Sequence, residues 1–331
     1  MLKKFLSYLL FFFPSFLNVP IRKLMGQKIG KHTKIKLGTI LLAKTVEIGD
    51  NSTLGPFSII KTENIRIGKN STIKPLSILS TREIIIDDYV HIAPLCIINS
   101  EFTQYSKIEI GNHSRLFPFC WLDTGKGIKI GKHVGIGGHT LIFTHGVWSN
   151  YMKGGPISYG PVTIEDNVWL PWRIFVLPNV TIGENTIVGA NSLINKSHPK
   201  NTLIAGNPAK VLRENIIQKL SNEEKVNRLF SIIENFKGYV DFKFKIDCSS
   251  SDTIFSISKI KIDSVKELKN GDILLINTSE INIYNHTDLI NRNISIIDFN
   301  SNDSYSTKKK NELFILLISY LRGYGIRLNK L

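Results

Sequence analysis

The residues of this chain that could carry out chemistry are few, and a histidine near the middle is the first of them. His145 stands in the phrase Phe143-Thr144-His145-Gly146 and begins a stretch that holds several glycines and aromatic residues. A free imidazole titrates near pH 6.5, so it can accept a proton close to neutral pH and act as a general base. His145 is therefore the leading candidate for proton transfer.

The three cysteines are poorer candidates for catalysis. Cys96 and Cys120 each follow an aliphatic residue by four positions, Ile92 and Leu116, and Cys248 stands far from both. Their odd number and wide spacing exclude a disulfide framework and a Cys-x-x-Cys metal site. We interpret Cys96 and Cys120 as small core residues, and we expect a reducing, cytoplasmic setting.

A six-residue repeat must position these side chains, and it runs from Ile29 to about Lys196. Its phrase is an aliphatic residue, often a glycine, two polar residues and a small residue, as in 48–52, 67–71, 110–114, 182–186 and 188–192. The aliphatic starts Ile48, Ile67 and Ile86 are 19 positions apart, so three phrases make one coil. Such a period predicts a solenoid with its aliphatic side chains inside a narrow three-sided prism. Within the repeat, the apolar residues lack the spacing of three and four that an amphipathic helix needs.

The repeat is interrupted by a long stretch that begins next to His145. The aliphatic ladder runs through Ile130, Ile136 and Ile142 and resumes only at Ile164. A loop of about 20 residues inside a compact domain is uncommon unless it is functional, and an insertion in a solenoid forms a loop on one face. We therefore expect the functional site at this break.

The repeat and three landmarks resemble the hexapeptide-repeat acyltransferases, in particular the branch of maltose, galactoside and xenobiotic O-acetyltransferases. The landmarks are His145 at the loop, the Ile-x-x-x-Val-Trp phrase at 164–169, and the Ala-Gly-x-Pro-x-Lys-Val phrase at 205–211. The resemblance covers roughly Ile29 to Arg213. It implies a mainly β fold with a left-handed parallel β-helix, acetyl-CoA as co-substrate, no metal, and a homotrimer with sites between neighbouring prisms.

The resemblance also implies roles for single residues. His145 would be the general base of direct acetyl transfer, and Asp123 lies where the maltose-type enzymes carry an acidic residue facing the acceptor. There it would hold a sugar hydroxyl or orient the histidine; the alternative is an ordinary surface carboxylate. The remaining candidates are expected at the coenzyme A site (Trp169, Ala190, Lys196, Lys210 and Arg213) and at the carbohydrate acceptor (His139, Trp148 and Arg173).

One phrase departs from the family pattern. Where the family commonly has small residues after Val-Trp, this chain has Leu170-Pro171-Trp172-Arg173. The bulk of Trp172 and Arg173 predicts a reshaped path for the pantetheine arm of coenzyme A.

The charge and the start of the chain indicate an anionic partner. Lys and Arg number 42 and Asp and Glu 27, a formal net charge of +15, which suits coenzyme A or anionic lipid; we predict no nucleic acid partner. The apolar run after Lys3 and Lys4 is too short to span a bilayer and has no cleavage site. We expect residues 1–25 to contact the inner face of the cytoplasmic membrane; the alternative is a helix that caps the first coil.

Four segments are predicted. They are an amphipathic N-terminal segment with a short helix (1–27), the left-handed β-helix acetyltransferase domain (28–212), a helical cap or linker (213–236) and a small C-terminal α/β domain of unknown role (237–331). Helical spacing supports the cap, and short apolar runs followed by a helix support the α/β domain.

The expected function is acetyl-CoA-dependent O-acetylation of a sugar hydroxyl in a surface polysaccharide (capsule, O-antigen or exopolysaccharide) or in its precursor. The first alternative is N-acetylation of an amino-sugar nucleotide, which needs the same donor and base. A γ-class carbonic anhydrase-like metal protein would need three histidines on zinc, for which only His91, His139 and His145 are candidates. A non-enzymatic scaffold is the last alternative.

Overall fold

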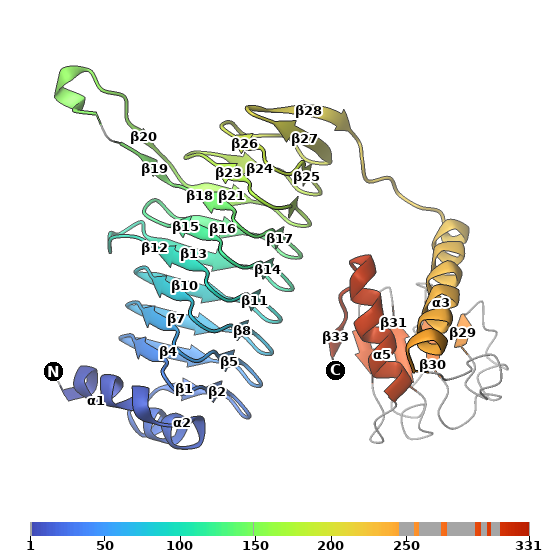
Figure 1. Ribbon diagram of the computed structural model, residues 1–331, viewed down its shortest axis with the longest axis horizontal. Coiled ribbons are helices and arrows are strands. Elements are labelled where there is room, and N and C mark those ends of the chain that lie inside the picture. Colours follow the sequence, from blue (N-terminus) through green and yellow to red (C-terminus); the bar gives the residue numbers. More distant parts are fainter. Residues whose placement is uncertain are drawn as a thin grey trace. The chain divides into compact units, whose positions relative to one another are not determined.

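The computed structural model divides the chain into two compact units, Met1–Gln218 and Lys219–Leu331. It describes residues 2–147, 149–244, 255–257, 273–276, 295–298, 303–305 and 312–330. The first unit is a three-sided prism of stacked coils with two short helices at its N-terminal end (Figure 1).

Each coil of the prism adds one strand to each of three sheets, which we call A, B and C. All prism pairings are parallel except that of the last two strands of sheet B. Sheet A holds β1 (Lys28–Ile29), β4 (Thr45–Ile48), β7 (Asn64–Ile67), β10 (Glu83–Ile86), β13 (Lys107–Ile110), β16 (Ile128–Ile130), β21 (Val162–Ile164) and β24 (Thr181–Ile182). Sheet B holds β2 (Lys34–Ile35), β5 (Thr53–Leu54), β8 (Thr72–Ile73), β11 (His91–Ile92), β14 (Arg115–Leu116), β17 (Gly135–Ile136), β22 (Trp169–Leu170), β25 (Ile187–Val188), β27 (Thr202–Gly206) and β28 (Ala209–Glu214). Sheet C holds β3 (Ile40–Leu42), β6 (Ile59–Lys61), β9 (Ile78–Ser80), β12 (Ile97–Asn99), β15 (Trp121–Asp123), β18 (Leu141–Ile142), β23 (Phe175–Val176) and β26 (Leu193–Ile194).

The aliphatic ladder of the sequence forms the core of this prism. Ile48, Ile67 and Ile86 pair in register on sheet A and are all buried. A Cβ on Gly49 would lie 2.7 Å from the backbone carbon of Gly68, so the turn after the ladder residue requires glycine. Cys96 and Cys120 are buried in the same core. The predicted β-helix and the interpretation of these two cysteines are confirmed.

The three corners of the prism differ in composition. The corner between sheets A and B places Tyr89, His113 and His133 in the left-handed region and stacks their rings, with centroids 4.7 and 5.0 Å apart. We call the corner between sheets B and C the second corner and the corner between sheets C and A the third corner. His145 and Asp123 both belong to the third corner.

The N-terminal segment caps the first coil. It consists of α1 (Leu2–Leu9), η1 (Leu10–Phe12) and α2 (Ser15–Leu24). Arg22 is buried; its Nε donates to Asn18 Oδ1 over 2.8 Å and its Nη1 to the carbonyl of Leu41 over 3.3 Å, and burial lowers the pKa of Arg22 to about 10. The structure thus shows the capping helix that was the alternative interpretation, and Arg22 is not available to lipid. Among the described residues, no helix combines the length and apolar character needed to cross a bilayer.

The stretch expected to form a helical cap, 213–236, is divided between the two units. Strand β28 pairs antiparallel with β27 and ends at Glu214. Helix α3 (Asn222–Phe244) belongs to the second unit, where Leu229, Ile233 and Phe236 share a core cluster with side chains of β31 and α5. The helical spacing identified the helix but not its packing partner.

The second unit is a small α/β structure, as expected. Its described elements are α3, a five-stranded sheet and the helices α5 (Glu312–Leu321) and η4 (Arg322–Tyr324). The sheet has the order β29 (Phe255–Ile257), β30 (Ile273–Ile276), β31 (Ser295–Asp298), β32 (Asp303–Tyr305) and β33 (Asn329–Lys330). Cys248 lies outside the described residues.

Candidate active site

The break in the repeat forms a hairpin that projects from the third corner (Figure 1, green). Its strands are β19 (His145–Gly146) and β20 (Ser158–Tyr159), and η2 (Tyr151–Lys153) lies near its tip. His145 pairs with Tyr159 across the hairpin. The predicted loop therefore contains an antiparallel hairpin, and His145 sits at its base, where the hairpin leaves the prism.

At this base the structure brings His145 and Asp123 together. Nδ1 of His145 lies 2.9 Å from Oδ1 of Asp123, and the two side chains are 47% and 11% exposed. Asp123 ends strand β15, and His145 follows strand β18, which pairs with β15 in sheet C. The parallel stacking of coils thus places two residues 22 positions apart side by side.

Two further donors fix the same carboxylate oxygen. The buried hydroxyl of Thr144 donates to Asp123 Oδ1 over 2.8 Å, and the amide of Gly125 donates to it over 3.3 Å. The amide of Lys126 in turn donates to Thr144 Oγ1 over 2.9 Å. This network orients the carboxylate toward the imidazole ring.

The geometry determines what the histidine can do. When the neutral ring carries its proton on Nδ1 and donates it to Asp123, the lone pair is on Nε2. That arrangement makes Nε2 a base, and the nearby carboxylate stabilises the imidazolium that forms after proton uptake. In this tautomer the imidazole can therefore abstract a proton.

A cation between two aromatic rings lies next to this pair. Nζ of Lys126 lies 4.8 Å from the ring centroid of Tyr105 and 5.0 Å from that of Tyr159, the partner of His145 in the hairpin. Sequence reasoning missed Thr144, Lys126 and both tyrosines, because no spacing pattern links them along the chain. The only signal in the sequence was that Thr144 directly precedes His145.

The residues expected at the acceptor do not all lie near His145. His139 and Arg173 occupy the second corner in the left-handed region, and the ring of His139 stacks on Phe119 with centroids 4.9 Å apart. Within one chain, sheet C separates them from His145. Trp148 lies outside the described residues.

The residues expected at the coenzyme A site lie mostly on the last coils of sheet B. Trp169 faces outward over Gly135, and its ring meets that of Phe117 edge-on at 5.9 Å. Ala190 follows β25 on the exposed side, and Lys210 and Arg213 are exposed on β28. Lys196 is exposed after β26 and therefore lies at the third corner, on the same edge as His145.

Trp172 shows the consequence of the departure from the family phrase. A Cβ on Gly138 would clash with the ring of Trp172, and this ring lies 5.9 Å from that of His139. The indole therefore occupies space above Gly138 on the second corner.

The three histidines that a zinc site would need lie apart. His91 is on sheet B, His139 at the second corner and His145 at the third. Burial, with the charges of Arg115 and Lys74, lowers the pKa of His91 to about 4. Within the described ranges, no group of three or more His, Cys, Asp or Glu side chains could hold a metal ion.

Comparison with known proteins relates the prism to acetyltransferases. No protein-family model matches the chain. The galactoside O-acetyltransferase of Escherichia coli K12 is 31% identical over 127 residues, which are 32% of this chain and 63% of that protein. A protein of the same strain, named provisionally as a colanic acid biosynthesis acetyltransferase, is 36% identical over 110 residues, 33% of this chain and 60% of the relative.

A solved structure is similar over a larger share of its length. The hexapeptide-repeat-containing acetyltransferase of Vibrio cholerae is 30% identical over 41% of this chain and 73% of its own, with a TM-score of 0.32. The same protein has been solved with acetyl coenzyme A. This sequence identity agrees with the six-residue repeat and with the prism that the repeat builds. The chain belongs to the hexapeptide-repeat acyltransferase family.

The similarity to other members of the hexapeptide-repeat family is confined to part of each protein. The chain spans 49% to 63% of the length of the first curated relatives that it matches. What this family member does as a whole protein is therefore a matter of proposal.

Proposed function

We propose that this protein is an acetyl-CoA-dependent O-acetyltransferase that acts on a sugar hydroxyl of a surface polysaccharide or its precursor. The observation that carries the proposal is the contact of 2.9 Å between His145 Nδ1 and Asp123 Oδ1 at the base of the hairpin. The names of the relatives, which refer to galactoside and colanic acid, and the acetyl coenzyme A complex of the Vibrio protein support the substrate classes.

The proposed reaction is a direct transfer. Nε2 of His145 takes the proton of the acceptor hydroxyl while its oxygen attacks the thioester carbonyl carbon. The tetrahedral intermediate collapses, the carbon–sulfur bond breaks, and the imidazolium returns the proton to the sulfur of coenzyme A. The products are an acetyl ester and free coenzyme A, and Asp123 stabilises the transient positive charge on the ring.

The proposed assembly is a homotrimer, and the outer surface of sheet C supports it. The outward residues of its strands pair in register and are all apolar (Ile40, Ile59, Ile78, Ile97, Trp121, Leu141, Phe175 and Leu193). The second corner adds the exposed residues Phe57, Leu76, Leu95 and Phe119 in the left-handed region, where bulky residues are uncommon. A face of this kind is expected to be covered by another subunit.

Such an assembly would also complete the site. It would bring the second corner of one subunit, with His139 and Arg173, toward the third corner of a neighbour, with His145.

The proposed location is the cytoplasm, with peripheral membrane contact through residues 1–25. Phe12 and Phe16, which are 72% and 74% exposed, support that contact, and co-flotation with anionic vesicles is its test.

The experiment that tests the function is acetyl transfer from radiolabelled acetyl-CoA. We expect the label to enter hydroxyl-bearing oligosaccharides as an ester, which mild alkali removes. An alkali-stable product on an amino-sugar nucleotide would mean N-acetylation instead. Absence of transfer to every sugar, with no binding of coenzyme A, would contradict the proposal and favour a scaffold.

A further inference from the structure

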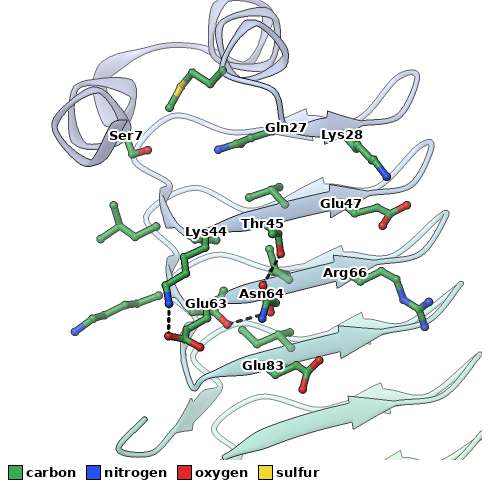
Figure 2. A pocket seen from close by; sticks show the side chains of 18 of the residues that line it. Ser7, Gln27, Lys28, Lys44, Thr45, Glu47, Glu63, Asn64, Arg66 and Glu83 are labelled. Carbon is green, nitrogen blue, oxygen red and sulfur yellow. Dashed lines mark hydrogen bonds and ion pairs between the residues drawn. The ribbon is translucent and has the colours of Figure 1, made fainter. Parts of the chain in front are cut away.

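A trough that plays no part in the proposed reaction lies near the N-terminal end of the prism. It has a volume of about 1090 Å³ and follows the third corner and the adjoining strands of sheet A (Figure 2). Tyr8 and Gln27 of the N-terminal segment line it at one end, and Phe102 of the loop between β12 and β13 lines it at the other. The trough is as large as the largest sites typical of small-molecule ligands, about 1,000 Å³.

The floor of the trough combines apolar surface with a row of polar groups and with charges of both signs. Successive coils contribute Thr45, Asn64 and Glu83, which pair in register, and Thr45 Oγ1 lies 2.7 Å from Asn64 Oδ1. Beside this row, Lys44 and Glu63 form an ion pair of 2.6 Å. Figure 2 shows these side chains at the edge of the sheet, in neighbouring coils.

The walls of the trough add aromatic surfaces. Tyr8 is 52% and Phe102 41% exposed, and Nζ of Lys61 lies 5.7 Å from the Phe102 ring centroid. Hydroxyl, amide and carboxylate groups on a floor between exposed rings suit the alternating hydroxyl and C–H surfaces of sugars.

The loop that carries Phe102 also reaches the candidate active site. The hydroxyl of Thr103 donates to the carbonyl of Gly125 over 3.4 Å, in the turn that follows Asp123. Tyr105 contacts Lys126, which in turn contacts Tyr159 of the hairpin. A chain of contacts therefore joins the trough to the base of the hairpin along the third corner.

The register of sheet C gives the separation. Asp123 pairs with Asn99, Asn99 with Ser80, and Ser80 with Lys61 of the trough. At 4.7–4.9 Å per strand, three steps correspond to about 14 Å. That separation exceeds the size of one sugar ring. Only an acceptor of several residues could therefore reach the trough and His145 at the same time.

We infer that the trough is a binding site for the distal residues of an extended glycan acceptor, whose reacting residue lies at His145. The inference rests on the proposed function and specifies its substrate as a chain of several sugars. A nucleic acid site would be dominated by cations, whereas three carboxylates line this trough beside its four cations (Glu47, Glu63 and Glu83; Lys28, Lys44, Lys61 and Arg66).

The test compares acceptors of increasing length on the full-length protein. The probes are β-1,4-galactan oligosaccharides and oligogalacturonides of one, two, four and six residues, one neutral series and one acidic series. Binding is measured by titration calorimetry without acetyl-CoA. We expect the hexamer of at least one series to bind at least about tenfold more tightly than its monomer.

Two substitutions in the trough have matched controls. Phe102→Ala removes an exposed ring, and Glu83→Gln removes a charge while keeping the shape of the side chain. Their controls are Phe230→Ala, at a similarly exposed phenylalanine of α3, and Glu109→Gln, on the neighbouring strand β13 outside the trough. We expect both trough variants to lose at least fivefold in hexamer affinity, and both controls to keep it.

The outcomes separate the two proposals. The inference is overturned if hexamers bind no more tightly than monomers in both series, if both trough variants keep the gain, or if uridine diphosphate displaces the hexamer. Length-dependent binding that is lost in the trough variants, without acetyl transfer to any sugar, would refute the proposed function and retain the trough. Transfer to monomers without any gain from length would refute only the trough.

Discussion

At the scale of single residues, one carboxylate oxygen organises the candidate site. Oδ1 of Asp123 accepts hydrogen bonds from Thr144 and Gly125 and lies 2.9 Å from His145 Nδ1. A carboxylate held by two other donors cannot turn away from the ring without losing both bonds. The orientation of the imidazole is therefore determined in advance of substrate binding.

Asp123→Asn tests this orientation. The amide keeps the shape of the side chain but removes the negative charge that stabilises the imidazolium, and its NH₂ group can face Nδ1 and reverse the tautomer. We expect kcat to fall at least about tenfold while KM for acetyl-CoA stays within about twofold. Steady-state kinetics measure both constants.

Two substitutions at Thr144 serve as controls for that experiment. Thr144→Ser keeps the hydroxyl that donates to Asp123 and should keep kcat, whereas Thr144→Val removes it and should lower kcat. An Asp123→Asn enzyme with unchanged kcat would show that the carboxylate does not orient the base.

The sequence predicted part of the site for identifiable reasons. His145 stood out because it begins the only long break in the ladder, and Asp123 was named through the family resemblance. The contacts of Thr144, Lys126, Tyr105 and Tyr159 depend on which coils stack and on how the hairpin leaves the corner. A pattern along one chain contains no such information.

At the scale of elements, the prism was predictable because its period is short and strict. Each coil repeats an inward aliphatic position, so the spacing of Ile48, Ile67 and Ile86 along the chain is enough to identify the stacking. The helix over 222–244 was visible from its apolar spacing. The surface against which this helix packs could not be predicted, because an apolar helical face can pack on any apolar surface. In the structure, Leu229 and Phe236 pack in the second unit.

The corners of the prism differ in the residue types that occupy their left-handed positions. Left-handed conformation suits asparagine, and the corner between sheets A and B uses Asn51, Asn70 and Asn185 in this way. The second corner instead places Leu76 and Leu95 there, which strains the backbone. Such strain is expected where the side chains have a use in an interface.

At the scale of the whole molecule, the proposed association of subunits would explain both the apolar face of sheet C and the strained second corner. The expected site residues are otherwise split between two corners of one prism. In the proposed trimer, a neighbouring subunit brings His139 and Arg173 toward His145. Assembly and activity should therefore be lost together.

The double substitution Leu76→Asn with Leu95→Asn tests the trimer. Asparagine suits the left-handed backbone but removes apolar contact area, so the isolated prism should remain folded while association weakens. We expect a mass of about 112 kDa for the wild type, from three chains of 37.4 kDa, and a shift toward the single-chain mass in the variant. Light scattering after gel filtration measures the mass, and circular dichroism reports whether the prism is folded.

A substitution to asparagine at a left-handed position of the corner between sheets A and B provides the control. His32 is exposed there in the left-handed region, and His32→Asn should leave the mass unchanged. A wild-type protein of single-chain mass, or a variant that stays fully associated, would contradict the proposed interface.

The most direct measurement is the rate of acetyl transfer by His145→Ala, with coenzyme A affinity measured on the same preparation. A general base contributes about 10²–10⁴-fold, so we predict a fall in kcat of at least about a hundredfold with coenzyme A affinity retained, and no fall in the control His32→Ala. Turnover by His145→Ala equal to that of the wild type would contradict the central claim that this imidazole takes the proton of the acceptor.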